Sequence, residues 1–510
     1  MPLFFILTKS IVLLYSFTMN ICKLIINDEV NIKLDGLDPK TRRQCVDALK
    51  YKIPNAHFMR TVRLGRWDGI VSFMTIGGGT YLNLFPRVYD IIKNNGYDFV
   101  VEDKRQSREI DLGEIDKNYF ADTNWGKGHR LEGQPIILDD HQVESINVLL
   151  KKKQGLVEAA TGAGKTIITA ALSKKVQHLG RSIVIVPSKD LVLQTEKDYI
   201  TLGLDAGVFY GKRKEFNKTH TICTWQSLNR LNENTKDGLS DVEIAEFLDD
   251  VIMFLVDEAH LAPGQSIQKL LSGPFANTPL RWGLTGTVPK EPHLKTAIES
   301  TIGEVLHVVP ANELQEKGFL SNCHVNIIQF IDEDAVRAKG EEPKHEEWSQ
   351  EDDFLATDSE LLQKAANSII DIAKNGNTFV LTSRRPSCET LQSLIPGSVY
   401  FHGGKKDTSS RQEAYDDMND KDNQIIIATF GIASTGINIP RIFNLVLYNP
   451  GKSFTRVIQS IGRGLRKAKD KDFVNITIIC TTNKWSSRHL TKIKSFLKEA
   501  KYPFTHKKIK

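Results

Sequence analysis

The sequence contains few cysteines, and their spacing does not suit a disulfide scaffold or a zinc site. Its six cysteines are scattered over 510 residues, without a C-x-x-C pair and without a Cys/His grouping at zinc-ligand spacing. Small disulfide-rich secreted domains and zinc modules are therefore excluded as fold classes. The thiols are expected to be reduced, as in the cytoplasm of a host cell.

Long apolar runs are also missing. The apolar run of residues 2–15 is interrupted by Lys9 and is too short to span a bilayer. It has neither the basic start nor the small-residue cleavage site of a signal peptide. We interpret residues 1–18 as an upstream extension of the reading frame, with a membrane anchor as the alternative. A soluble protein without a membrane partner is expected.

The chain has no strong excess of one charge. Its formal net charge is +5, so a nucleic-acid partner has to be inferred from local patches and not from the total. The hydrophobic fraction of 40% is enough for ordinary cores. The length suggests about three or four domains.

A glycine-rich loop is the first chemical motif. Residues 159–166, A-A-T-G-A-G-K-T, stand between the apolar residues 155–157 and the helix-like run 167–172. A strand, a glycine loop and a helix in this order cradle phosphate groups, because backbone N–H groups and the helix N-terminus face the anion. Lys165 is expected to reach the β- and γ-phosphates, and the Thr166 hydroxyl to bind Mg²⁺.

The loop residues expected to contact a nucleotide are Thr161, Gly162, Ala163, Gly164, Lys165 and Thr166. Gln142, at the start of a helix upstream, is expected to contact the adenine base, although an ordinary surface glutamine is the alternative. For the octapeptide alone, a chance glycine turn ahead of a helix stays open.

Two carboxylates follow a second apolar run. Residues 251–256 are apolar, as in a strand buried on both faces of a parallel sheet, and Asp257 and Glu258 come next. Asp257 is expected to hold Mg²⁺ through its water shell and Glu258 to accept a proton from the attacking water. Residues 281–287 form another strand end, whose hydroxyls are expected to couple this site to neighbouring elements.

The second half of the chain carries four further sequence segments that look like helicase motifs, at residues 378–384, 400–404, 425–440 and 459–466. The last reads Q-S-I-G-R-G-L-R, which places Gln459, Arg463 and Arg466 on one short segment. Arginines supplied from a second lobe neutralise charge on a γ-phosphate, an effect worth about 10³ to 10⁵ in rate in other nucleotidases. Hydrolysis would then require the second lobe to close on the first.

In this order the blocks resemble the Q motif and motifs I to VI of superfamily 2 helicases. The resemblance implies an α/β fold of two RecA-like parallel-sheet lobes, ATP and Mg²⁺ as cofactors, and a nucleotide contact at Gly436 in motif V. The small N-terminal α+β domain with R-W-D-G at residues 66–69 is similar to that of UvsW-type phage branch-migration helicases.

That resemblance implies an ATP-dependent DNA helicase or translocase with nucleic-acid-stimulated ATP hydrolysis. It would remodel forks and Holliday junctions in replication, recombination and repair, acting on branched or duplex DNA and on single strands, with a monomer preferred. An RNA helicase and a nucleotide-gated clamp without strand separation are the alternatives. A restriction nuclease is disfavoured, because residues 1–118 show no metal-carboxylate nuclease pattern.

Six segments are expected along the chain: an extension (1–18), an N-terminal α+β DNA-binding domain (19–118), lobe 1 with motifs I to III (119–310), an exposed acidic linker or helical excursion (311–360), lobe 2 with motifs IV to VI (361–485) and a basic C-terminal helix and tail (486–510). In the N-terminal domain the pattern predicts a strand over 24–34, a helix over 39–51 and a hairpin around the glycines at 77–79.

Contacts to DNA are expected at basic, aromatic and strand-end residues: Arg60, Arg63, Arg66, Trp67, Thr224, Gln226, Arg384 and Thr429. For the first four of these, a solvated face with a core tryptophan is the alternative.

Overall fold

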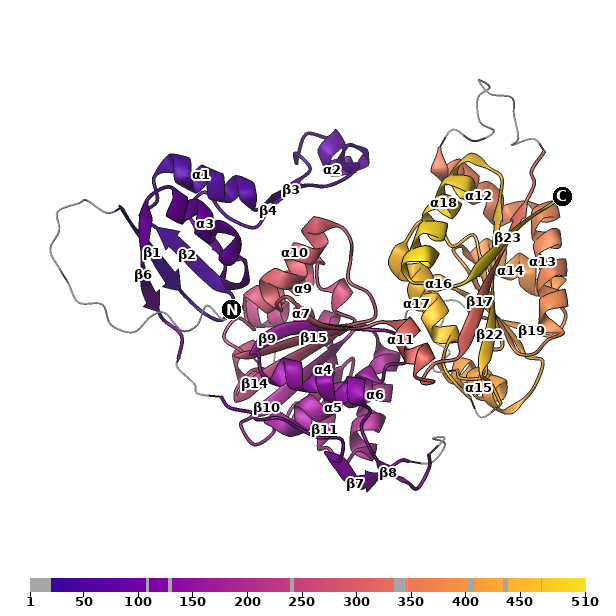
Figure 1. Ribbon diagram of the computed structural model, residues 1–510, viewed down its shortest axis with the longest axis horizontal. Helices are drawn as coiled ribbons and strands as arrows, with labels where there is room; N and C mark the ends of the chain where they lie inside the picture. The colour runs from indigo at the N-terminus through magenta and orange to yellow at the C-terminus, as the bar shows by residue number, and fades with distance from the viewer. Residues whose placement is uncertain are drawn as a thin grey trace. The chain divides into compact units, whose positions relative to one another are not determined.

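The computed structural model describes residues 20–106, 110–126, 131–238, 243–333, 345, 347–401, 408–433, 439–468 and 470–510. The chain divides into two compact units, with the boundary between Arg108 and Glu109 (Figure 1). Among the described residues, no helix has both the length and the apolar character needed to cross a membrane.

The first unit is built on a four-stranded sheet in the order β5-β2-β1-β6. Its strands are β1 (Asn20–Ile26), β2 (Asn31–Asp35), β5 (Gly79–Tyr81) and β6 (Tyr97–Asp103). Helices α1 (Pro39–Ala48) and α3 (Pro86–Asn94) pack on each other. Helix α1 begins where the Asp38 carboxylate accepts hydrogen bonds from the backbone N–H groups of Lys40 and Thr41.

The hairpin predicted around residues 77–79 is wrong. Strand β4 (Ile70–Ser72) pairs with β3 (Lys50–Lys52), whereas β5 pairs with β2. The glycines serve a close backbone approach instead: Gly78 has φ +88°, its carbonyl accepts a hydrogen bond from the N–H of Leu34, and a Cβ at Gly78 would lie 2.2 Å from the Leu34 oxygen.

Lobe 1 of the second unit holds an eight-stranded sheet in the order β12-β11-β13-β10-β14-β15-β9-β16, parallel throughout except for the β11–β12 pair. Its strands are β9 (Gln154–Ala159), β10 (Arg181–Val186), β11 (Ala206–Tyr210), β12 (Arg213–Lys214), β13 (His220–Thr224), β14 (Val251–Asp257), β15 (Leu280–Thr285) and β16 (Val305–Val309). Its helices are α4 (Asp140–Leu150), α5 (Lys165–Val176), α6 (Lys189–Thr201), α7 (Trp225–Lys236), α8 (Ile244–Phe247), α9 (Gln265–Ser272) and α10 (Pro292–Thr301).

Lobe 2 holds a seven-stranded parallel sheet in the order β19-β20-β18-β21-β22-β17-β23. Its strands are β17 (Asn322–Phe330), β18 (Thr378–Thr382), β19 (Ser398–Phe401), β20 (Ile425–Thr429), β21 (Asn444–Tyr448), β22 (Phe473–Thr481) and β23 (Phe504–Ile509). The helices of this part of the chain are α11 (Ala311–Glu316), α12 (Trp348–Thr357), α13 (Ser359–Ala373), α14 (Arg385–Leu394), α15 (Thr408–Asp420), α16 (Phe430–Ala433), α17 (Phe454–Gly464) and α18 (Lys484–Glu499). The expected fold class, two parallel-sheet lobes with a small α+β domain, is confirmed.

The acidic linker expected over 311–360 is wrong for much of its length. Strand β17 lies inside the lobe 2 sheet, paired with β22 and β23, and buries alternate side chains such as Val325 and Ile327. In α12 the Glu351 side chain is 1% exposed and accepts hydrogen bonds from the backbone N–H groups of Trp485 and Ser486. Some acids of this segment therefore have fixed partners and are not simply solvated.

The tail expected after residue 486 is also more ordered than predicted. Helix α18 extends to Glu499, and β23 adds an edge strand parallel to β17, with Val325 opposite Phe504. Lys507 and Lys508 of β23 are both exposed along this sheet edge.

The domain boundary expected at residue 118 lies later in the chain than the structural one. Leu112 and Ile115 are buried in the core of the second unit, together with Phe120 from β7 (Phe120–Asn124). Strand β7 pairs with β8 (Pro135–Ile136), so part of the turn-rich connection is itself a small ribbon.

Candidate active site

The glycine loop follows β9 and leads into α5. Gly162 and Gly164 have φ of +92° and +81°, left-handed values that a side chain disfavours. The twelve-residue helix α5 begins at Lys165, whose ammonium donates to the carbonyl oxygen of Ala159 over 3.3 Å. The loop therefore has the backbone shape and helix N-terminus of a phosphate cradle.

Helix α4 braces this loop from the side. The side-chain amide of Gln142 donates to the carbonyl oxygen of Ala163 over 3.3 Å, and a ring nitrogen of His141 lies 3.0 Å from the same oxygen. The Gln142 carbonyl accepts the backbone N–H of Asp139 and completes a capping box. In this structure both ends of the Gln142 amide contact protein, so its position supports the loop directly.

The two predicted carboxylates stand at the end of β14, and in the sheet β15 lies between this strand and β9. Asp257 accepts the backbone N–H of Glu258 over 2.9 Å. Glu258 has φ +55°, a left-handed conformation that is rare outside glycine and recurs at functional sites.

The surroundings of the two acids shift their pKa values in opposite directions. Burial and the neighbouring charge of Glu258 raise the pKa of Asp257 above its usual range. Burial opposes ionisation of Glu258 too, but the positive charge of Lys165, the hydrogen bond from His260 and the charge of Arg463 outweigh it and hold its pKa below its usual range. Glu258 is therefore kept ionised, the state in which a carboxylate can accept a proton.

His260 links these acids to the next strand. Its Nδ1 lies 3.3 Å from Glu258 Oε2 and 3.1 Å from the hydroxyl of Thr285, which in turn donates to the Thr287 carbonyl. Neither His260 nor His141 was expected as a site residue. The sequence signal for His260 was its position close to the two acids, two residues after Glu258.

Helix α17 brings the motif VI residues of lobe 2 to this site. The Gln459 amide lies 3.4 Å from both Glu258 Oε2 and His260 Nδ1. A Cβ added to Gly462 would lie 2.8 Å from the Cβ of Thr161, so α17 reaches the glycine loop at a point where only glycine fits.

Arg463 and Arg466 are positively charged groups in buried positions on this side. Burial lowers the pKa of both, and repulsion from Arg463 lowers that of Arg466 further, to about 10. An anion placed between the loop and these guanidinium groups would relieve that repulsion.

The structure brings Lys165, Asp257, Glu258, Gln459 and Arg463 together in one site, with Gln142 and the other residues of the glycine loop beside them. The next residues were expected to contact DNA or, at Gly436, the nucleotide. Thr224 is buried and its hydroxyl accepts the N–H of Ser227 at the start of α7, while Gln226 is exposed. Thr429 ends β20, and Gly436 lies outside the described residues.

Arg384 and the N-terminal group were expected at DNA. Arg384 forms ion pairs with Asp352, at 2.9 Å, and with Asp353, so release of these pairs would have to precede a phosphate contact. Arg60, Arg63 and Arg66 are exposed in the first unit.

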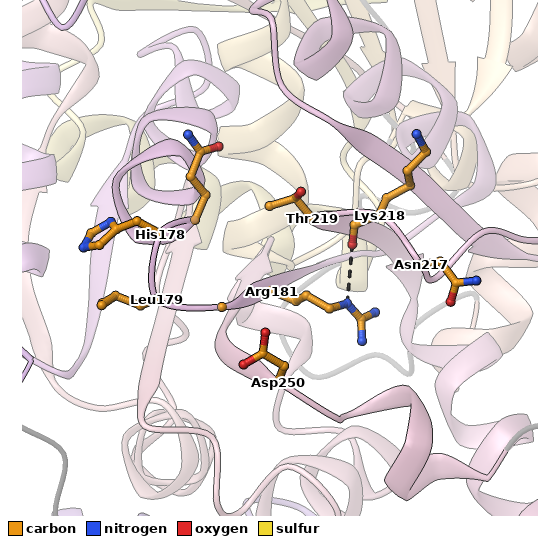
Figure 2. A pocket seen from close by; sticks show the side chains of 9 residues that line it. His178, Leu179, Arg181, Asn217, Lys218, Thr219 and Asp250 are labelled. Atoms are coloured by element: carbon orange, nitrogen blue, oxygen red, sulfur yellow. Dashed lines mark hydrogen bonds between the residues drawn. The ribbon is translucent and has the colours of Figure 1, made fainter.

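A small open pocket lies at the opposite, amino-terminal edge of the lobe 1 sheet, beside Arg181, Thr219 and Asp250 (Figure 2). The Arg181 guanidinium there donates to backbone carbonyl oxygens of Lys218 at 3.4 Å and Asp249 at 3.0 Å. The Arg181 guanidinium therefore connects the backbone segments that contain Lys218 and Asp249. The pocket is distinct from the site at the carboxyl edge of the sheet.

Residues of the site fit a nucleoside triphosphate with Mg²⁺. The glycine loop and the α5 N-terminus offer an anion cradle, Thr166 follows Lys165 as a hydroxyl ligand, and Asp257 supplies a carboxylate at the end of β14, which β15 separates from β9. Two buried arginines supply positive charge from the other lobe.

Comparison with known proteins gives two family matches. Residues 135–290 match the model described as "Type III restriction enzyme, res subunit", and residues 360–468 match the "Helicase conserved C-terminal domain". These ranges contain the glycine loop with the two acids and the Q-x-x-G-R-x-x-R helix, respectively.

Curated relatives span most of the chain. The ATP-dependent DNA helicase uvsW of Enterobacteria phage T4 is 23% identical over 88% of this chain and 88% of its own length. The DNA 3'-5' translocase XPB2 of Sulfurisphaera tokodaii is 24% identical over 68% of this chain and 82% of its own length.

A solved structure shares the fold. The ATP-dependent Type ISP restriction-modification enzyme LlaBIII bound to DNA has a TM-score of 0.53 at 15% identity, covering 82% of this chain and 34% of that one. The two family matches and the curated relatives show that the chain resembles the superfamily 2 helicases, with UvsW among them.

Proposed function

We propose that this helicase is an ATP-dependent DNA helicase or translocase that remodels branched DNA by branch migration of Holliday junctions and fork regression. The observation that carries ATP hydrolysis is the contact between Gln459 of α17 and Glu258, the residue after β14, which joins the two lobes at the acid expected to act as the base. The choice of DNA rests on the likeness to uvsW and XPB2, whose names give DNA as their substrate.

In this proposal ATP with Mg²⁺ supplies the phosphoanhydride whose hydrolysis drives movement. The glycine loop binds the phosphates through its N–H groups and Lys165, while Thr166 and Asp257 hold the metal. The Oε atoms of Glu258 accept the proton of the attacking water, and Arg463 and Arg466 neutralise charge that develops on the γ-phosphate.

Movement follows from the position of these groups on two lobes. Because Gln459, Arg463 and Arg466 come from α17, the site is complete only while α17 lies against the lobe 1 loops, and product release allows it to leave. Each cycle would shift the strand ends along a DNA backbone. Phosphate contacts dominate such binding, so it is expected to be salt-dependent and largely independent of sequence.

The remaining assignments are part of the same proposal. The first unit would bind DNA, the two parallel-sheet lobes of the second unit, β17 and β23 included, would form the motor, and the protein would act as a monomer in the host-cell cytoplasm, in replication, recombination and repair.

The test is a matched panel of a fork, a four-way junction, a linear duplex and a structured RNA, each scored for ATP hydrolysis and for ATP-dependent strand exchange. We expect the branched DNAs to stimulate hydrolysis most and to be converted. Glu258→Gln should abolish turnover while preserving ATP-dependent DNA binding.

RNA helicases are also among the relatives of this chain, so an RNA helicase is the second candidate. Stronger stimulation by RNA than by any DNA would favour it. Equal ATP hydrolysis with and without nucleic acid would contradict a motor, and DNA binding gated by ATP without turnover in the wild type would favour a clamp.

A further inference from the structure

A basic projection stands on the first unit. Residues 53–69, here called the α2 knob, contain the short helix α2 (Arg60–Arg63) and are carried by the β3–β4 ribbon, in which Lys52 pairs with Ile70. Figure 1 shows α2 at the end of this ribbon, away from the four-stranded sheet of the same unit.

The knob exposes large apolar side chains. Phe58 is 73% exposed, Met59 44% and Leu64 53%. A single exposed apolar residue is ordinary, but three within one short projecting segment form a patch of the kind that binds a partner. The Phe58 ring lies 4.1 Å from the His57 imidazole, and with 73% of its surface exposed it is open to a further partner.

Charge identifies the partner. Arg60, Arg63 and Arg66 are all exposed in the knob, and Asp68 is its one acidic residue. A surface that alternates arginines with an exposed aromatic ring matches a nucleic-acid strand, because phosphates pair with guanidinium groups while a base stacks on the ring. An apolar protein partner would gain nothing from the three arginines.

Contacts within residues 53–70 hold the base of the α2 knob in place. The Trp67 indole N–H donates to the carbonyl oxygen of Ile70 over 2.9 Å, and the Ile53 N–H donates to the carbonyl of Gly69. Gly69 has φ +78°, and a Cβ there would lie 2.7 Å from the Cβ of Ala56. Trp67 was expected to contact DNA, but its indole N–H is used in this hydrogen bond at the base of the knob. The exposed aromatic side chain on which a base can stack is therefore Phe58.

We infer that the α2 knob binds unpaired nucleotides of the DNA substrate, with a base stacked on Phe58 and the neighbouring phosphates held by Arg60, Arg63 and Arg66. This inference rests on the proposed function, since a motor on branched DNA produces unpaired or exchanging strands. It adds a single-strand contact on the first unit to the contacts made by the two lobes.

The experiment uses the full chain and a single-stranded oligothymidylate of about 20 nucleotides carrying 2-aminopurine, whose fluorescence falls on stacking. Phe58→Ala should weaken binding by about 5- to 150-fold, the range that corresponds to one lost base stack, and should remove part of the quenching. Phe58→Tyr should retain both. Ile76→Ala, an 80% exposed apolar residue of the same unit outside the knob, is the matched control and should bind as the wild type does.

The arginines have a separate signature. Arg63→Gln should lower the slope of log affinity against log salt by about 0.7, the value for one phosphate contact on a single strand, and leave the quenching of bound DNA unchanged. Oligouridylate is measured in parallel, and tighter binding of RNA than of DNA through Phe58 would overturn the assignment to DNA.

The outcomes separate this inference from the proposed function. If Phe58→Ala binds and quenches like the Ile76→Ala control while DNA still stimulates ATP hydrolysis, the knob inference is wrong and the motor proposal stands. If no DNA stimulates hydrolysis but Phe58→Ala still loses the oligothymidylate, the motor proposal fails and the knob remains a single-strand site.

Discussion

Lys471 shows how one buried residue can hold the arginines of the site in place. Its side chain is 2% exposed, and its ammonium donates to the carbonyl oxygens of Pro440 at 3.0 Å, Gly464 at 2.5 Å and Arg466 at 2.8 Å. These carbonyls lie just after motif V and at the end of α17. Burial and, after it, the charge of Arg466 lower the pKa of Lys471 to about 7.

This pKa predicts a pH-dependent stability. An unfolded lysine keeps its proton up to a pKa near 10.5, so between pH 7 and 10 the unfolded chain binds more protons at this position than the folded chain. The free energy of unfolding should therefore rise with pH, by at most about 1.4 kcal/mol per pH unit from this residue. Lys471→Met lacks that contribution.

Urea unfolding of the wild type and of Lys471→Met from about pH 7.5 to 9.5 measures the contribution of Lys471 to the free energy of unfolding. We expect the difference in unfolding free energy, wild type minus Lys471→Met, to grow as the pH rises. A difference that stays constant over this range would mean that Lys471 remains fully protonated in the folded chain, held by its three carbonyl partners.

Residues of the ATP site were predictable because their chemistry is local. The glycines, Lys165 and Thr166 are contiguous, and Asp257 and Glu258 directly follow an apolar strand. The bracing role of Gln142 was not predictable, because its partner Ala163 becomes a neighbour only when α4 packs beside the loop. His260 needed the sheet order, which sets Thr285 beside the end of β14.

At the scale of elements, the parallel strands were the most predictable part of the fold. Strands such as β10 and β14 are buried on both faces and therefore read as continuous apolar runs. Strand β17 escaped prediction because it buries only every second residue and stands next to an acid-rich segment. Composition averaged over 311–360 hides that alternation.

Glu351 of α12 is an acid that stabilises an element far away in the sequence, the N-terminus of α18. Its carboxylate caps α18 through the N–H groups of Trp485 at 2.8 Å and Ser486 at 2.6 Å. Glu351→Ala would leave these buried donors without an acceptor and should lower the free energy of unfolding by about 1–3 kcal/mol. Glu351→Gln keeps one acceptor oxygen and should cost less.

Equilibrium urea unfolding tests the order of the variants. The matched control is Glu360→Ala, an exposed acid at the start of α13 whose ion pair with Lys364 is solvated and should contribute under about 1 kcal/mol. An Ala variant at Glu351 that is as stable as this control would show that water replaces the carboxylate at the α18 N-terminus.

For the whole molecule, the decisive feature is that one site is shared by two lobes, and Gly462 is a point where α17 comes close to the glycine loop. A Cβ there would lie 2.8 Å from the Cβ and 3.0 Å from the hydroxyl of Thr161, so Gly462→Ala must push α17 away from the glycine loop. Because Gln459 and Arg463 lie on the same helix, the shift displaces them together. A displacement of about 1 Å can reduce turnover by about 10²-fold.

We therefore expect Gly462→Ala to lower kcat for ATP hydrolysis by about that factor while changing nucleotide affinity little, since the phosphate cradle belongs to lobe 1. Steady-state hydrolysis and binding of a fluorescent ATP analogue separate the two effects. Gly464→Ala is the control on the same helix: its nearest neighbours would stand at 3.4 Å, an ordinary contact, so turnover should be kept. If both variants hydrolyse ATP alike, approach of α17 to Thr161 does not limit turnover, and coupling between the lobes must then be sought in the Gln459–Glu258 contact alone.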